Sequence, residues 1–157
     1  MKQLEGFQYA TALYLNMRYY TLRLSPASQY ITTIVTEFGK FKYNRFPMGM
    51  CASGNIFQAK VYELLGDIEG VKTYIDNILV LGKDIFEKHI DQLKIIFGGM
   101  RAVGLKFNAP KCSFGLKWIP YLGYVITREG IKPDQNKVQG IVDLGRPSKT
   151  TLRRIKF

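Results

Sequence analysis

Four basic side chains, expected on adjacent strands and interleaved with aromatic ones, could hold a nucleic acid. The basic residues are Arg23, Lys40, Lys42 and Arg45, and the aromatic residues among them include Phe41 and Tyr43. On adjacent strands, such side chains can contact phosphates and stack on bases. A solvated hairpin would carry the same charges, so the residues alone leave both interpretations open.

The net charge also favours a polyanionic partner. The chain of 157 residues has 23 Lys and Arg against 12 Asp and Glu, which gives a formal net charge of +11. Five of the basic residues lie in residues 144–157, where no acidic residue occurs. This end is either a solvated basic tail or a segment that contacts phosphates.

The composition excludes several other classes of protein. With two cysteines and one histidine, the chain can form neither a disulfide framework nor a zinc-ligand cluster. It has no run of roughly 20 apolar residues, and its first residues lack the apolar stretch of a signal peptide. We therefore expect an intracellular protein of the cytoplasm or nucleus, not secreted and without a membrane partner.

Strand-like and helix-like periodicities alternate along the chain, which predicts a single α+β domain. Strands are expected at residues 8–15, 19–24, 30–36, 41–46, 71–75, 78–82, 105–108 and 112–114, with a hairpin at 119–132. Helices are expected at residues 54–65, 84–103 and 134–145. This order predicts a split βαβ layout with an edge hairpin.

Two of the expected turns and strands depend on particular residues. Asp76 and Asn77 are expected to form the turn between strands 71–75 and 78–82, because both side chains tolerate left-handed backbone. Gly123 is expected inside a strand, where glycine often marks the close approach of another backbone or a ligand.

The helices are expected to bury apolar stripes. For helix 84–103 the stripe consists of Phe86, Ile90, Leu93, Phe97 and Met100. His89 of the same helix is expected to be exposed. The last helix, capped by Asp134, is expected to pack Val138, Ile141 and Val142.

Several short segments then occur in the order and spacing of one known family. They are residues 4–6, 12–15 with Tyr19, 46–50, Phe57-Gln58, 74–77, 104–114, 121–124 and 130–138. Together they resemble the reverse transcriptase domain of gypsy-type LTR retrotransposon Pol proteins. Tyr74-Ile75-Asp76-Asn77 stands where that family has Tyr-x-Asp-Asp.

The resemblance implies a fold, an activity and a set of partners. Residues 1–143 would form a reverse transcriptase palm, ferredoxin-like, with partial fingers, and residues 144–157 would begin the connection region. The chain is expected to be a partial, degenerate copy of the domain. The implied activity is RNA-directed DNA polymerisation, a nucleotidyl transfer that uses Mg²⁺. The implied partners are an RNA or DNA template–primer, deoxynucleotides and other Pol segments.

The same resemblance assigns the catalytic positions, and two of them are substituted. The family places three metal-binding aspartates at positions that correspond to Tyr14, Asp76 and Asn77, so Asp76 is the one carboxylate left. Two-metal phosphoryl transfer needs carboxylate oxygens at these places. The sequence therefore predicts a polymerase domain that is inactive or severely impaired. The alternatives are a non-catalytic nucleic-acid-binding module and a functionless remnant of a mobile element.

Further site residues are carried over from the family motifs. Tyr19, Gln58 and Lys111 would contact the nucleotide. The primer grip would be formed by Tyr121, Leu122, Gly123 and Tyr124. The residues alone offer plainer interpretations: a buried strand aromatic for Tyr19, an exposed helix residue for Gln58 and a solubilising charge for Lys111.

Overall fold

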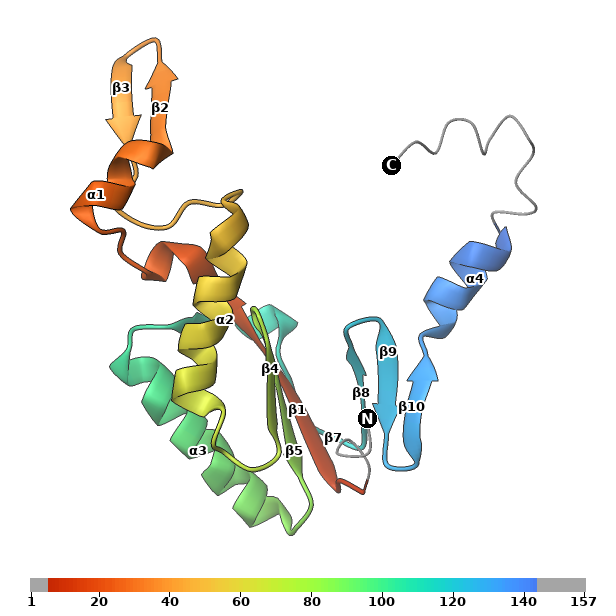
Figure 1. Cartoon of the computed structure of the whole chain (residues 1–157). Helices are drawn as coiled ribbons and strands as arrows, with labels where there is room; N and C mark the ends of the chain where they lie inside the picture. The colour runs from red at the N-terminus through yellow and green to blue at the C-terminus, as the bar shows by residue number, and fades with distance from the viewer. Residues whose placement is uncertain (1–5, 144–157) are drawn as a thin grey trace.

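The computed structural model describes residues 6–143, so the predicted basic segment 144–157 lies outside the described residues. Its centre is an antiparallel sheet with the strand order β4-β5-β1-β6, in which β7 also pairs with β1. The strands are β1 (Tyr9–Asn16), β4 (Val71–Tyr74), β5 (Asn77–Gly82), β6 (Lys106–Phe107) and β7 (Ser113–Leu116). β5 lies between β1 and β4, which run parallel, and this confirms the predicted split βαβ layout (Figure 1).

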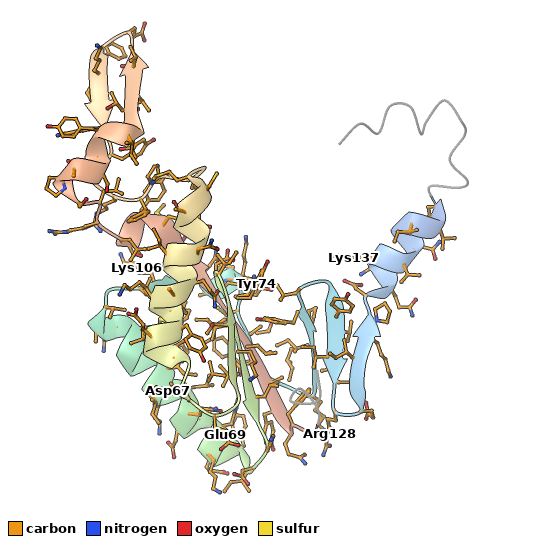
Figure 2. The ribbon with its side chains drawn as sticks, viewed as in Figure 1. Asp67, Glu69, Tyr74, Lys106, Arg128 and Lys137 are labelled. Atoms are coloured by element: carbon orange, nitrogen blue, oxygen red, sulfur yellow. The ribbon has the colours of Figure 1, made fainter. Side chains whose placement is uncertain are left out.

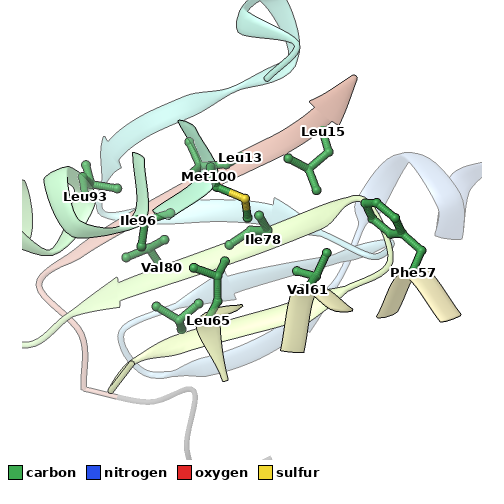
Figure 3. Close-up of a cluster of buried hydrophobic side chains, with 11 residues drawn as sticks. Leu13, Leu15, Phe57, Val61, Leu65, Ile78, Val80, Leu93, Ile96 and Met100 are labelled. Atoms are coloured by element: carbon green, nitrogen blue, oxygen red, sulfur yellow. The ribbon is translucent and has the colours of Figure 1, made fainter. Parts of the chain in front are cut away.

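Two helices, α2 (Cys51–Leu65) and α3 (Phe86–Ala102), cover one face of this sheet (Figures 1 and 3). The spacing of Phe57, Val61 and Leu65 along α2 is one helical turn, so all three side chains reach the sheet. Because side chains alternate between the two faces of a strand, Leu13 and Ile78 point to the helix side and belong to the same apolar cluster. The main core is therefore formed between the helices and β1 and β5.

A second sheet lies against the opposite face of the central sheet (Figure 1). It contains β8 (Trp118–Tyr121), β9 (Tyr124–Thr127) and β10 (Gly130–Pro133) in the order β10-β9-β8. A second apolar cluster fills the space, with Ala12 and Leu79 from the central sheet and Ile119 and Ile126 from the second sheet. The alternate residues of β1 and β5 thus face two different cores.

A third unit projects from the upper end of α2 (Figure 1). It contains the short helix α1 (Pro26–Gln29) and the hairpin of β2 (Thr33–Thr36) and β3 (Gly39–Lys42). Both strands are exposed along their whole length. Among the described residues, no helix is both long enough and apolar enough to span a membrane.

The structure corrects two backbone predictions. Residues 19–24 do not form a strand, because the chain turns at Met17, which has a positive φ of 46°, into the 3₁₀ helix η2 (Arg18–Thr21). Residues 119–132 form two hairpins instead of one, because Leu122 and Gly123 both have positive φ, at 49° and 83°. Gly123 therefore lies in a tight turn of the kind that joins hairpin strands, not inside a strand.

Side-chain packing on the helices also differs from the predictions. His89 is buried, at 2% exposure, and the buried stripe of α3 contains His89, Leu93, Ile96 and Met100. Phe86 and Phe97 of the predicted stripe are exposed. On α4 (Gln135–Asp143), Val138, Ile141 and Val142 are exposed too, because this helix extends away from both sheets (Figure 1).

Candidate active site

Three positions of the predicted catalytic set meet at one end of the central sheet. In the pairing of β1 with β5, Tyr14 lies opposite Asn77. The N–H of Leu15 donates a hydrogen bond of 2.9 Å to the backbone carbonyl of Asp76. Segments 62 residues apart in the sequence, at Tyr14 and Asp76, are thus side by side through backbone pairing alone.

The turn that carries Asp76 is strained. It consists of Ile75 and Asp76, one residue earlier than predicted, because Tyr74 and Asn77 already pair as strand residues. Ile75 has a φ of 54°, a conformation that a β-branched residue rarely adopts. Such strain persists only where surrounding contacts hold the backbone in place.

Gln58 on α2 supplies those contacts. Its Oε1 accepts a hydrogen bond from the N–H of Ile75. Its Nε2 donates to the carbonyl and to the hydroxyl of Thr73, at 3.2 and 3.1 Å. The structure therefore places Gln58 against the hairpin as a positioning residue, and its contact with a nucleotide stays a prediction.

The site has one carboxylate, at Asp76, and an amide beside it. Nδ2 of Asn77 donates to Oδ1 of Asp76 at 3.4 Å, while Oδ1 of Asn77 is buried without a hydrogen-bond partner among the described residues. Within residues 6–143 there is no group of three or more His, Cys, Asp or Glu side chains that could hold a metal ion. Hard divalent cations prefer several charged oxygen ligands, so the residues present do not fit a two-metal centre.

Tyr14 shares its face of β1 with Ala12 and is half-buried against the second apolar cluster. That cluster includes Tyr121 of β8, which is 9% exposed. Burial, and to a smaller extent the neighbouring Tyr14 phenol, together raise the pKa of Tyr121 to about 12. The ring of Tyr14 therefore belongs to an apolar, neutral environment between β1 and the β8–β9 hairpin.

The backbone of Tyr14 is fixed by the segment after β6. Its carbonyl accepts a 2.7 Å hydrogen bond from the N–H of Asn108, and its N–H donates to Sγ of Cys112 at 3.4 Å. These contacts bring the 3₁₀ helix η4 (Ala109–Lys111) to the site, with the Lys111 side chain exposed. Local sequence pattern could not reveal the role of Cys112, because its partner, Tyr14, is 98 residues away.

Tyr19 lies on η2 at the entrance to α2. Its ring meets Phe57 edge-on, with 5.9 Å between the ring centroids. Its hydroxyl would lie 3.7 Å from a Cβ at Gly54, so the glycine leaves room beside it. The ring is half-buried on a 3₁₀ helix, so the plainer interpretation of a buried strand aromatic is wrong about the element, and the contact of Tyr19 with a sugar stays a prediction.

The predicted primer grip forms the β8–β9 hairpin. Tyr121 points into the second cluster, whereas Leu122 and Tyr124 are exposed. The Lys137 side chain of α4 lies directly over Gly123, where a Cβ would collide with it. The turn thus favours glycine for its backbone conformation, whereas the flexible Lys137 side chain could move aside for a Cβ.

The predicted basic cluster separates into two pairs. Arg45 forms an isolated bridge with Arg23, and its Nη1 donates to the carbonyls of Tyr20 and Thr21 at 3.0 and 3.1 Å. Arg45 therefore connects its own segment to residues 20–23. Lys40 and Lys42 project from β3, with the Lys42 amine 4.4 Å from the ring centroid of Tyr30.

Comparisons with known proteins match both the sequence and the fold. The family model "Reverse transcriptase (RNA-dependent DNA polymerase)" matches residues 1–126. The chain is 27% identical over 158 residues to the retrovirus-related Pol polyprotein from transposon opus of Drosophila melanogaster, covering 99% of this chain and 16% of that protein. It is 31% identical over 140 residues to the corresponding polyprotein from transposon 412 of the same species, covering 87% of this chain and 11% of that one. The chain thus spans a small part of these relatives.

Solved structures of foamy viral protease-reverse transcriptase share the fold. One, in complex with double-stranded DNA, superposes with a TM-score of 0.87 at 23% identity, over 96% of this chain and 26% of the other. A native crystal structure of the prototype foamy virus protein gives a TM-score of 0.71 at 27% identity, over 88% and 20% of the two chains. These likenesses confirm the predicted α+β palm architecture.

Proposed function

Because the chain belongs to the reverse transcriptase family, as the match over residues 1–126 establishes, we propose that it binds a template–primer and does not transfer nucleotides in its present sequence. It is the reverse transcriptase domain of a retroelement Pol protein. In this proposal residues 1–143 are the palm with partial fingers, and residues 144–157 begin the connection region. The two parts of the proposal depend on different residues, so one can be disproved without the other.

The observation that carries the loss of activity is the meeting of Tyr14, Asp76 and Asn77 at one point with a single carboxylate. Two Mg²⁺ ions would supply charge neutralisation and orientation for an in-line displacement. A phenol and an amide offer no charge to hold them, and Tyr14 is packed into an apolar cluster. Losing even an outer partner of a metal costs about 10- to 100-fold, so losing two direct ligands costs more.

Binding of nucleic acid is supported by other parts of the molecule. Lys40 and Lys42 are exposed on the β2–β3 hairpin, and Tyr124 is exposed on the β8–β9 hairpin. The net charge of +11 favours phosphate contacts. The related foamy viral structures were solved in complex with an RNA/DNA hybrid and with double-stranded DNA.

The test of the catalytic part compares the parent chain with a Tyr14→Asp, Asn77→Asp double variant. Mn²⁺ binding, followed by electron paramagnetic resonance, should become at least about tenfold tighter in the double variant, because two carboxylates join Asp76. A matched control is Asn55→Asp, Gln135→Glu, which adds the same charge at exposed positions on two separate helices. The control should bind Mn²⁺ like the parent.

Primer extension with Mg²⁺ and with Mn²⁺ completes this test. We expect no extension by the parent chain. Robust extension by the parent would overturn the proposed loss of activity, as would a control variant that gains as much Mn²⁺ affinity as the double variant. Extension by the double variant alone would show that the lost carboxylates are the whole cause.

The binding part is tested with a labelled RNA/DNA hybrid in fluorescence anisotropy. Affinity should fall steeply with rising salt, because bound phosphates release counterions. A Lys40→Gln, Lys42→Gln variant should bind more weakly and show a shallower salt dependence. Absence of binding to hybrid and to single strands at low salt would refute this part and leave the remnant interpretation.

A further inference from the structure

The outer side of α3 carries apolar residues that the fold does not bury. Phe86 and Phe97 lie on this side, next to the stripe that packs on the sheet, whereas Ile90 between them is partly buried against the main core. Phe86 is 43% exposed and Phe97 is 36% exposed. The helix therefore has a second apolar side, facing away from the main core.

This side of α3 borders two hollows that share Lys94 and Phe97 as lining. One, of about 640 Å³, lies between α3 and the β6 region, where the rings of Phe97 and Phe107 meet edge-on at 5.2 Å. The other, of about 370 Å³, lies between α3 and β7 and reaches Phe114, which is 53% exposed. We call the two together the α3 groove.

Gly98 lies on the wall of this groove, in the middle of α3. A glycine inside a helix costs roughly 1 kcal/mol relative to alanine. At Gly98 a Cβ would meet no heavy atom within 4 Å among the described residues, so packing within the chain does not require the glycine. Its effect is to keep the groove open beside Phe97.

The rim of the groove is basic. Lys94 and Arg101 stand two turns apart on α3, and Lys106 lies across from them at the start of β6. One acidic residue, Asp91, pairs with Lys94 at 2.7 Å, which leaves the rim with a positive excess. A second copy of this chain, with its net charge of +11, is a poor electrostatic match.

We propose that the α3 groove docks an acidic amphipathic segment of a partner protein, with aliphatic or aromatic side chains inserted beside Phe97 and carboxylates on the basic rim. An amphipathic helix in an apolar groove is a common mode of recognition between proteins. The groove lies across the central sheet from Tyr14, so docking there leaves the β8–β9 face free. Figure 2 shows Lys106 on the helix side of the molecule, away from Lys137 beside the second sheet.

A protein segment fits this groove better than a nucleic acid does. Its lining mixes phenylalanine rings with the aliphatic side chains of Leu105 and Ile90, and the ring of Phe97 meets Phe107 edge-on, an arrangement that suits inserted apolar side chains better than a row of stacked bases. Its few cations stand at the rim, where carboxylates of a helix can reach them. Competition by an oligonucleotide therefore serves as an opposing outcome of the test.

The probe is a fluorescein-labelled peptide of about 15 residues, with Leu and Phe at helical spacing on one face and Glu on the other. A scrambled peptide of the same composition is the reference. Fluorescence polarisation with the full chain should give binding of the amphipathic peptide at least about tenfold tighter than that of the scrambled one, a difference that corresponds to 1.4 kcal/mol. Binding should weaken with added salt.

Gly98→Leu should abolish this difference, because the new side chain extends into the groove from a position where a Cβ meets no heavy atom within 4 Å among the described residues. The matched control is Gly140→Leu on α4, where a Cβ also meets nothing among the described residues. A Lys94→Glu, Arg101→Glu variant should bind the peptide at least tenfold more weakly and needs no new packing. Thermal melts verify that all variants stay folded.

Three results would overturn the proposal. They are equal binding of the two peptides, unchanged binding by both Gly98→Leu and the charge reversal, and displacement of the peptide by an oligothymidine that Gly98→Leu no longer binds. The last result would assign the groove to single-stranded nucleic acid.

Discussion

The central sheet and the β2–β3 hairpin both contain apolar strand residues, but these are buried in the sheet and exposed in the hairpin. Strand β1 buries Leu13 completely, and β5 buries Ile78 and Val80. On β2 and β3, Val35 is 73% exposed and Phe41 is 50% exposed. The central sheet has helices on one side and a second sheet on the other, whereas the hairpin has neither (Figure 1).

The difference separates apolar residues that stabilise the fold from apolar residues that no part of the described fold covers. The central sheet is stabilised by its own core, so its apolar residues are accounted for within the chain. A two-stranded hairpin is marginal in water, and its exposed apolar residues gain nothing from the present fold. The substituted catalytic positions lie on the stable sheet, so in the proposed function their substitution removes the chemistry while the architecture stays intact.

The sharpest test of the comparison exchanges one phenylalanine in each region for alanine. Phe57 is 1% exposed in the main core. Phe57→Ala should lower the free energy of unfolding by about 3–5 kcal/mol, because it leaves a large cavity. Phe41→Ala on β3 should change the free energy by about 0.5 kcal/mol or less. Urea denaturation followed by far-UV circular dichroism measures both.

Similar losses for the two variants would break the comparison, since they would mean that the β2–β3 hairpin is packed in solution. Phe57→Leu is the companion variant, because it keeps most of the apolar volume. It should recover a large part of the stability lost in Phe57→Ala.

A smaller effect is expected at Gln58, where the core is joined to the strained turn. Gln58→Met keeps the shape and removes the acceptor for the N–H of Ile75 and the donor to Thr73. Leaving a half-buried backbone N–H without a partner costs about 1–3 kcal/mol. Gln139→Met, which breaks an exposed 2.7 Å hydrogen bond to Asp143, should cost less than about 0.5 kcal/mol under the same urea denaturation.

Hydrogen exchange distinguishes a local from a global role for Gln58. Amides of residues 73–78 should exchange faster in Gln58→Met, while those of α3 change only by the loss of overall stability. An equal increase in amide exchange across the whole chain would contradict the assignment of Gln58 as the positioning residue for this turn.

The sequence predicted the central sheet well because its elements carry local signals. Strand β5 is a continuous apolar run, and α2 repeats apolar residues at helical spacing. The meeting of Tyr14 with Asn77 followed from matching motifs, and the backbone register bears out that proximity. The sequence alone was therefore enough to predict both the family and the fold.

The errors arose where tertiary contacts override local pattern. On α3 the apolar residues span more than one side, so periodicity could not tell the buried stripe from the groove. His89 is buried because Thr11, 78 residues away, offers it a hydrogen bond. The strand expected at residues 19–24 was replaced by η2 because Tyr19 packs on Phe57.

His89 also provides a test of the core that depends on pH. Its Nε2 lies 2.8 Å from the hydroxyl of Thr11, and its Nδ1 is buried without a partner among the described residues. Burial lowers the pKa of His89 below its ordinary value of 6.5, and the neighbouring Gln92 side chain opposes the shift. In acid the unfolded chain therefore takes up its proton before the folded chain does.

Stability should accordingly be fully present above pH 6.5 and fall as the pH drops below that value. His89 is the single histidine of the chain, so few other groups titrate in this window. His89→Gln should flatten the dependence of unfolding free energy on pH between neutrality and the range where carboxylates titrate. An equally steep decline in this variant would contradict the assignment.

The smallest expected effect belongs to the β2–β3 hairpin itself. The Lys42 amine stands 4.4 Å from the ring centroid of Tyr30, an exposed cation–π contact that contributes about 0.5–1 kcal/mol. In Lys42→Met, the amides of residues 33–42 should exchange faster, and the unfolding free energy of the whole chain should stay within about 0.5 kcal/mol of the parent. Lys40→Met, on the same strand, is the matched control and should leave the exchange unchanged. If Lys42→Met instead destabilised the whole chain, the hairpin would be coupled to the central sheet, and the distinction between a self-stabilised palm and an outward-facing hairpin would not hold.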